Sequence, residues 1–148
     1  MIDESFPAMA VDPRTLGWLA RALNHEMGAV QQYLAQSVLA RLWGDVELAA
    51  HLRAEAMEEL EHAELLIERQ ILLGVAPCGG QLPVVRLGHN AQELFAHDQQ
   101  MEVQAVQLYV NALMHAQRLR DQDSIALFQS LLAQEQEHLE HITHTKSG

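Results

Sequence analysis

The chain has 148 residues, 49% of them hydrophobic and 5% aromatic, and a formal net charge of -11 at pH 7. This length suits a single core, and the shortage of β-branched and aromatic residues favours helices over sheets, so we predict one all-α domain spanning residues 1–148. Nine Lys and Arg residues are too few for nucleic-acid binding, and the absence of a long apolar run or a basic, apolar leader argues against a membrane partner and for a cytoplasmic protein.

The first half of the chain predicts two helices joined by a tight turn. Asp12 and Pro13 suit the N-cap and first position of a helix over about 13–43. Gly44 interrupts its apolar stripe, and Asp45 can cap a second helix over about 45–73 that ends at Gly74. Such a short connection forces the two helices into an antiparallel hairpin.

The second half repeats this plan after a connection over 75–89 that is rich in Pro and Gly. Asn90 with Glu93 resembles a capping box and begins a helix over 91–119, and Asp121 or Asp123 begins another over 123–143. We expect residues 143–148 to fray. A 15-residue connection can span about 50 Å, enough to cross a 30-residue helix of about 45 Å, so we predict a four-helix bundle of two antiparallel hairpins joined by one long crossover.

Two Glu-x-x-His tetrads carry the functional signal. Each follows a lone glutamate by the same 33 positions, and all six residues fall on apolar stripes where Leu, Val or Ile is expected. The predicted hairpins bring them to one level of the bundle. These candidate metal ligands are Glu26, Glu59, His62, Glu102, Glu135 and His138.

Buried carboxylates repel one another unless cations neutralise them. Four carboxylates and two imidazoles suit iron or manganese, and the set contains no thiolate of the kind structural zinc sites use. We therefore predict a dinuclear metal site, with a hydrogen-bonded polar core as the alternative. Tyr33 and Tyr109 each follow the lone glutamate of their half by seven positions, where each can hydrogen-bond a metal-bound carboxylate or simply fill the core.

The remaining sites are predicted to be unremarkable. Cys78 is expected to be a loop thiol, and a patch around His141 and His144 with Glu137 and Glu140 is expected to be a solvated helix end. Most of the other histidines are predicted to face solvent: His25, His51, His89, His97 and His115.

With these residues, the chain resembles the ferritin superfamily and, within it, bacterioferritin. The densest similarity lies in 25–33, in 58–63 and in 135–138, and the ligand set is the one described for ferritin-like bundles. The resemblance implies two iron ions per chain, with Glu59 and Glu135 bridging them. It also implies Fe(II) as substrate, O2 or H2O2 as oxidant, and ferroxidase activity serving iron storage or detoxification.

Two features depart from this resemblance. The methionine that binds haem in bacterioferritin is replaced by Leu60, which argues against haem, and the sequence carries no fifth helix. We therefore expect a homo-oligomer of at least two subunits and leave a 24-subunit cage open. The alternatives are a non-storage di-iron oxidase or rubrerythrin-like peroxide reductase, and a metal-free helical interaction module.

Overall fold

The computed structural model describes residues 11–147, with side chains to residue 145. Within that range there are four helices and no strand, which confirms the all-α expectation; residues 1–10, used above to argue against a leader, lie outside it. No helix in the described part has the length and apolarity needed to cross a membrane. The helices are α1 (Pro13–Leu42), α2 (Val46–Leu72), α3 (Ala91–Leu119) and α4 (Gln122–Ser147).

The helix ends form where the sequence places caps. Oδ1 of Asp12 accepts the backbone N–H of Arg14 at 2.8 Å, and the Asn90 side chain accepts that of Glu93 at 2.9 Å. Gly44 and Gly74, with φ of 84° and 80°, adopt the left-handed conformation that ends α1 and α2. These local signals set the helix lengths and therefore the height of each functional side chain.

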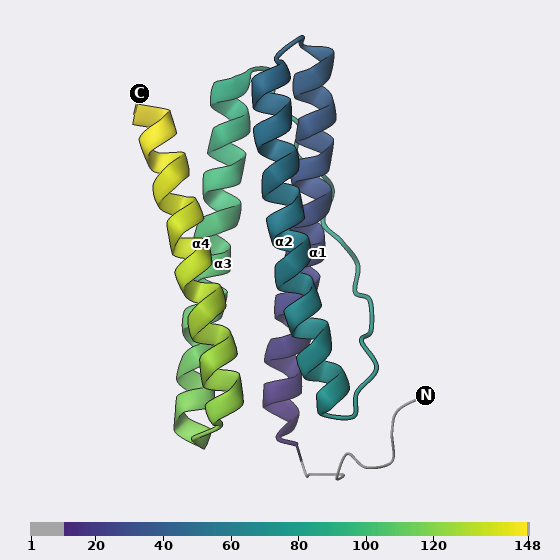
Figure 1. The fold of residues 1–148 in the computed structure, drawn as a ribbon, viewed down its shortest axis with the longest axis vertical. Coiled ribbons are helices and arrows are strands. Elements are labelled where there is room, and N and C mark those ends of the chain that lie inside the picture. Colours follow the sequence, from purple (N-terminus) through teal and green to yellow (C-terminus); the bar gives the residue numbers. More distant parts are fainter. Residues whose placement is uncertain (1–10, 148) are drawn as a thin grey trace.

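The four helices form a bundle of two antiparallel hairpins (Figure 1). α1 packs along α2, α3 packs along α4, and the closest backbone approach between the hairpins is that of α1 to α3. The crossover after α2 returns along the outside of the bundle to the start of α3. It is held against α1 by Gln32, whose amide donates to the Arg86 carbonyl at 2.8 Å and accepts the Arg86 N–H at 2.9 Å.

The last helix is longer than expected, because α4 continues to Ser147 and the expected fraying from residue 143 is wrong. The Thr143 and Thr145 hydroxyls donate to the carbonyls of Leu139 and His141 at 2.9 and 2.8 Å. No Gly or Pro interrupts the segment before Gly148. The helix therefore lacks a local stop signal.

The apolar core is divided into two clusters along the bundle axis. The lower core, near the start of α1 in Figure 1, draws on all four helices. The upper core draws only on α1, α2 and α3. The lower core consists of Leu19, Ala22, Leu23, Ala63, Leu66, Tyr109, Ala112, Ala116, Phe128 and Leu131, and the upper core of Tyr33, Ala40, Ala49, Leu52, Ala56 and Leu94.

Candidate metal centre

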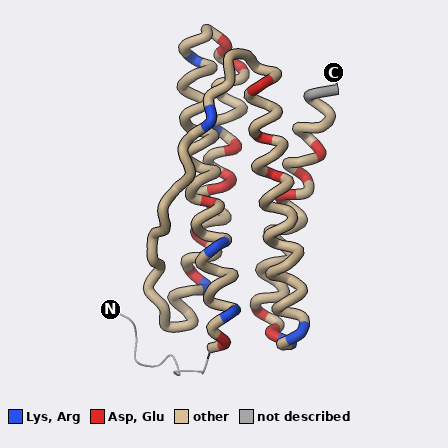
Figure 2. Tube along the Cα trace, turned by 180° about the vertical axis from the view of Figure 1, so that it is seen from behind, with Lys and Arg blue, Asp and Glu red and all other residues tan. Residues whose placement is uncertain are grey.

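The structure brings all six sequence-predicted ligand side chains together between the two cores. Each helix contributes at least one of them, and none is more than 7% exposed. Acidic positions recur along the bundle (Figure 2), but these four carboxyl groups are buried, as is that of Asp98. The six are Glu26 on α1, Glu59 and His62 on α2, Glu102 on α3, and Glu135 and His138 on α4.

The six side chains form two overlapping groups of four. One contains Glu26 and His62, the other contains Glu102 and His138, and both include the shared pair Glu59 and Glu135. Within each group the candidate ligand atoms lie within 4.8 Å of one another. We call these groups the His62 position and the His138 position. Two positions that share two carboxylates have the geometry of a dinuclear site with bridging ligands.

The imidazole Nδ1 atoms face the carboxylates in both positions. Nδ1 of His62 lies 2.8 Å from Glu135 and 3.5 Å from Glu59. Nδ1 of His138 lies 3.0 Å from Glu59 and 3.8 Å from Glu102. Residues three apart on a helix share a face, which is why each Glu-x-x-His tetrad can direct both of its side chains to one position.

Most of the inward-facing atoms have no hydrogen-bond partner among the described residues, although several carboxylate oxygens lie within 4.0 Å of an imidazole nitrogen. These atoms include both carboxylate oxygens of Glu59 and of Glu135, one oxygen each of Glu26 and Glu102, and Nδ1 of both histidines. A hydrogen-bonded polar core, the alternative reading, would satisfy such groups. Their oxygen and imidazole character fits iron or manganese ions, which would satisfy them by coordination.

The two tyrosines join the halves of the site crosswise. The Tyr33 hydroxyl donates to Glu102 at 2.6 Å, and the Tyr109 hydroxyl donates to Glu26 at 2.6 Å. Each tyrosine therefore bonds the lone glutamate of the other hairpin rather than its own. These bonds fix one oxygen of each carboxylate and leave the other directed at the site.

Burial and crowding shift the protonation of the centre in the metal-free state. Burial, with the adjacent Glu102 carboxyl group, raises the pKa of Glu135 to about 11, and burial also raises the pKa of Glu26. Burial would raise the pKa of Glu59 too, but the adjacent Glu26 and the two histidines lower it. Burial opposes protonation of His138, yet the adjacent carboxyl groups of Glu102 and Glu59 raise its pKa to about 12. Protons thus partly neutralise the cluster where cations would otherwise do so.

Two further residues contact the site that the sequence reasoning did not single out. The outer nitrogen of His62, Nε2, lies 2.8 Å from Oε1 of Gln134, and the outer nitrogen of His138 bonds the Glu58 carboxylate. Gln134 and Glu58 each directly precede a shared glutamate. The duplicated pattern makes their positions equivalent, but their contacts arise only where α2 and α4 pack together.

The side of the centre facing the upper core is polar. Asp98, 1% exposed, and Glu55 lie near His138, and burial raises the pKa of both carboxyl groups to about 7. Glu55, Glu58 and His138 also place one ligand atom each within 4.8 Å. Asp98 lies on the apolar stripe of α3 four positions before Glu102, a signal that the sequence already carries.

The histidine expectations are partly wrong. His115 is buried, 8% exposed, and its Nε2 lies 3.0 Å from the Thr15 hydroxyl, so it links α3 to the start of α1 instead of facing solvent. His25 and His97 are half-buried. His141 and His144 are exposed, and neither belongs to a close ligand group among the described residues.

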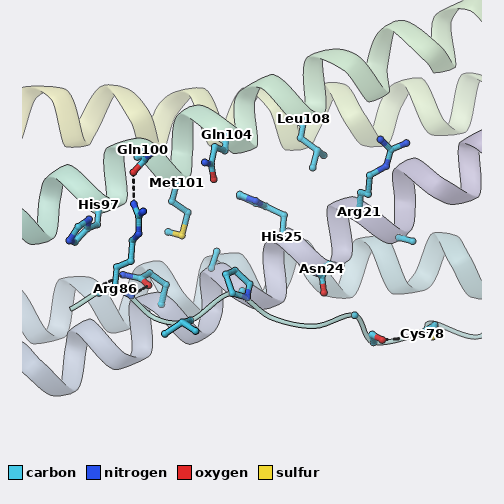
Figure 3. Close-up of a pocket in the computed structure, with 18 residues that line it drawn as sticks. Arg21, Asn24, His25, Cys78, Arg86, His97, Gln100, Met101, Gln104 and Leu108 are labelled. Atoms are coloured by element: carbon cyan, nitrogen blue, oxygen red, sulfur yellow. Dashed lines mark hydrogen bonds between the residues drawn. The ribbon is translucent and has the colours of Figure 1, made fainter. Parts of the chain in front are cut away.

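A large cavity lies apart from the metal centre. It measures about 840 Å³ and lies between α1, the crossover and α3. Figure 3 shows His25 directed into it, with Arg86 bonded to Gln100 at one end and Cys78 at the other. Cys78 is exposed, as expected. Among the described residues, the lining of this cavity contains no Asp, no Glu and none of the six candidate ligands, so its chemistry differs from that of the buried carboxylates.

Comparison with known proteins agrees with this geometry. The Ferritin family model, a ferritin-like domain, matches residues 18–146. Bacterioferritin of Mycolicibacterium paratuberculosis is 31% identical over 134 residues, covering 90% of this chain and 84% of that protein. Bacterioferritin of Brucella melitensis is 34% identical over 132 residues, covering 89% and 82%.

A solved structure is similar over nearly the whole fold. Rhodobacter capsulatus bacterioferritin gives a TM-score of 0.90 at 29% identity, and the match covers 94% of this chain and 87% of that one. That protein was solved with a metal-free dinuclear site and a haem iron. The four-helix bundle and its crossover are therefore those of a known fold.

Proposed function

Because the chain belongs to the ferritin-like family and is similar to bacterioferritins over most of its length, we propose that it is a ferroxidase that oxidises Fe(II) for iron storage or detoxification. The observation that carries the proposal is the pair of buried ligand groups sharing Glu59 and Glu135. Two Fe(II) substrates provide two electrons, which together with two protons reduce either O2 to H2O2 or H2O2 to two water molecules.

The side chains have distinct roles in this proposal. Glu59 and Glu135 hold both irons, Glu26 and His62 complete one position, and Glu102 and His138 complete the other. Tyr109 and Tyr33 orient Glu26 and Glu102 through their hydroxyls. The apolar cores on either side restrict access of bulk water, and the fixed carboxylates stabilise the additional positive charge of the oxidised product.

Iron binding is also expected to release protons. The pKa of Glu135 is raised to about 11 by burial and by Glu102, so this carboxyl group carries a proton at neutral pH that a metal ion must displace. We therefore propose that Fe(II) affinity rises with pH.

A non-storage di-iron oxidase or peroxide reductase is the second candidate, because the same ligand groups can serve it. The similarity to bacterioferritins over 90% of the chain favours storage. The metal-free interaction module is disfavoured by the unpartnered oxygens of Glu59 and Glu135. We further propose that no haem is bound, because leucine at position 60 offers no ligand; haem absorption after reconstitution of the protein with haem would contradict this.

The test is an anaerobic Fe(II) titration followed by addition of O2 or H2O2. We expect saturation near two irons per chain and rapid oxidation, with both severely impaired in Glu59→Ala. Glu61→Ala, an exposed position on the same helix, is the matched control and should behave as the unmodified protein. Saturation at one iron or none would overturn the proposal.

Native mass measurement of the same samples separates the two candidates. A large hollow particle that retains oxidised iron supports storage, whereas a stable dimer that releases it supports the non-storage oxidase. Assembly into at least a dimer and a cytoplasmic location are predictions, which the native mass measurement and cell fractionation test.

A further inference from the structure

The two metal positions are surrounded by different charges. The residue before each shared glutamate bonds the histidine of the other hairpin, so Gln134 contacts His62 and Glu58 contacts His138. These contacts occupy equivalent places in the duplicated pattern. One partner is a neutral carboxamide and the other is a carboxylate.

At the His62 position, the neighbour of the imidazole is Gln134, an uncharged hydrogen-bond acceptor. Oε1 of Gln134 lies 2.8 Å from Nε2 of His62, and because an amide oxygen can only accept, Nε2 is the donor. The Gln134 amide nitrogen donates to the Ser130 hydroxyl at 3.4 Å. In this orientation the amide nitrogen has an acceptor in Ser130 while the amide oxygen faces His62.

At the His138 position two carboxylates approach the same imidazole atom. Nε2 of His138 bonds Glu58, and an oxygen of Glu55 lies 3.6 Å away. At His62, by contrast, the ion-pair contacts with Glu26, Glu59 and Glu135 are made through Nδ1, the inner nitrogen. The asymmetry is therefore a difference in negative charge behind two otherwise similar ligand sets.

A carboxylate that accepts the outer N–H of a metal-bound histidine makes the inner nitrogen a stronger donor, and losing such a partner commonly weakens metal binding by 10- to 100-fold. An amide provides the hydrogen bond without the charge. From this geometry we infer that the His138 position binds its metal ion first and more tightly, with Glu58 and Gln134 as the positioning residues that set the order.

This inference rests on the proposed dinuclear site, and Co(II) tests it without requiring turnover. Crystals of the protein loaded with one equivalent of Co(II) per chain would give the occupancy of each position by anomalous scattering. We expect the His138 position to be at least about tenfold more favoured than the His62 position. Equal occupancies, or the opposite order, would overturn the inference.

Exchange of the two residues is the decisive comparison. Glu58→Gln or Gln134→Glu alone should bring the occupancies closer together, and the double variant should reverse the order. A purely structural role would weaken binding without reversing it. The inference is contradicted if both single variants keep the original difference in Co(II) occupancy. It is also contradicted if the double variant, with unaltered circular dichroism, still fills the His138 position first.

Matched controls make the same charge changes away from the imidazoles. Glu61→Gln on α2 and Gln136→Glu on α4 are exposed positions, and both should retain the original order. If the controls changed the ratio of Co(II) occupancies by a similar amount, the effect would be due to net charge, and the role of Glu58 and Gln134 would be rejected. Absence of Co(II) and Fe(II) from both positions would instead contradict the proposed function itself.

Discussion

The two ends of the bundle, on either side of the metal centre, are built differently. The lower core is formed by all four helices, and the buried Thr15 and His115 beside it bond each other. Among the described side chains, the upper core receives no buried residue from α4. There Asp98 is buried with one oxygen lacking a hydrogen-bond partner, and both polar atoms of the Gln36 amide lack one as well.

This difference suggests that the lower end contributes mainly to folding stability and the upper end mainly to the chemistry of the site. The lower core provides contiguous apolar burial, which is the main favourable contribution to folding. At the upper end, acidic groups near His138 are maintained at a cost in stability, because buried polar groups without partners are destabilising. Charged groups of this kind concentrate at functional sites. The predictions below test this division, from the largest expected effect to the smallest.

Truncation of apolar side chains should affect the lower end more. Leu66→Ala, at a fully buried lower position, is expected to lower the free energy of unfolding by about 4 kcal/mol, and Leu52→Ala in the upper core by about 2 kcal/mol. Denaturant unfolding of the metal-free protein measures both. Leu42→Ala at a 76% exposed position should change it by less than about 0.5 kcal/mol. Equal losses at the two ends would contradict the division.

Asp98→Asn should stabilise the metal-free protein at high pH. Burial, with the nearby Glu102 and Glu55, raises the pKa of Asp98 to about 7 from a model-compound value of 3.8. The folded state therefore binds the Asp98 proton more tightly than the unfolded state does. As the pH rises from 3.8 to about 7, the loss of this preference destabilises the folded protein, and the loss is complete above pH 7. We expect a gain of about 2 kcal/mol at pH 8 and none near pH 3. Unfolding at both pH values is the measurement, and a pH-independent change would refute the assignment.

Removal of the tyrosine hydroxyls compares equivalent contacts at the two ends. Tyr109→Phe leaves a Glu26 oxygen without its donor inside the lower core, and we expect a loss of about 2 kcal/mol. Tyr33→Phe removes the hydroxyl that donates to Glu102, beside the polar upper end. There we expect the free energy of unfolding to fall by about 1 kcal/mol. Thermal unfolding with a chelator present checks this order. A larger loss for Tyr33→Phe would show that the upper end is the more rigid.

The smallest effect concerns the polar link beside the lower core. Thr15→Val removes the hydroxyl that pairs with Nε2 of His115, and a loss of about 1 kcal/mol is expected because the imidazole stays buried. Thr15→Ser keeps the hydroxyl and should lose much less. Amide hydrogen exchange at the start of α1 reports the local effect, and unchanged exchange in Thr15→Val would show that the bond does not hold the helix end.

Much of the site followed from periodicity. The equal spacing of the two tetrads, their place on apolar stripes and the short hairpin turns were enough to bring Glu26, Glu59 and His62 to one height. The residues missed were those whose role depends on the opposite helix. Glu58 and Gln134 are ordinary polar residues in the sequence, and only the packing of α2 against α4 sets them beside His138 and His62.

His115 illustrates the same limit within the fold. It lies near the end of its helix, where a histidine is usually solvated, but the start of α1 covers it and Thr15 supplies a partner. The length of α4 was misjudged for a local reason, since hydroxyl groups that bond preceding carbonyls extend the helix without a recognisable stop.

The sequence by itself determined the helices, their hairpin order and the six inward-facing candidate ligands, because caps, turns and residue periodicity act within a few positions along the chain. Tertiary structure decided which tyrosine bonds which glutamate, which groups stand behind each histidine, and how the two ends of the bundle differ. These depend on the rotation and separation of helices that are remote in sequence, and side-chain packing across the whole bundle sets both quantities.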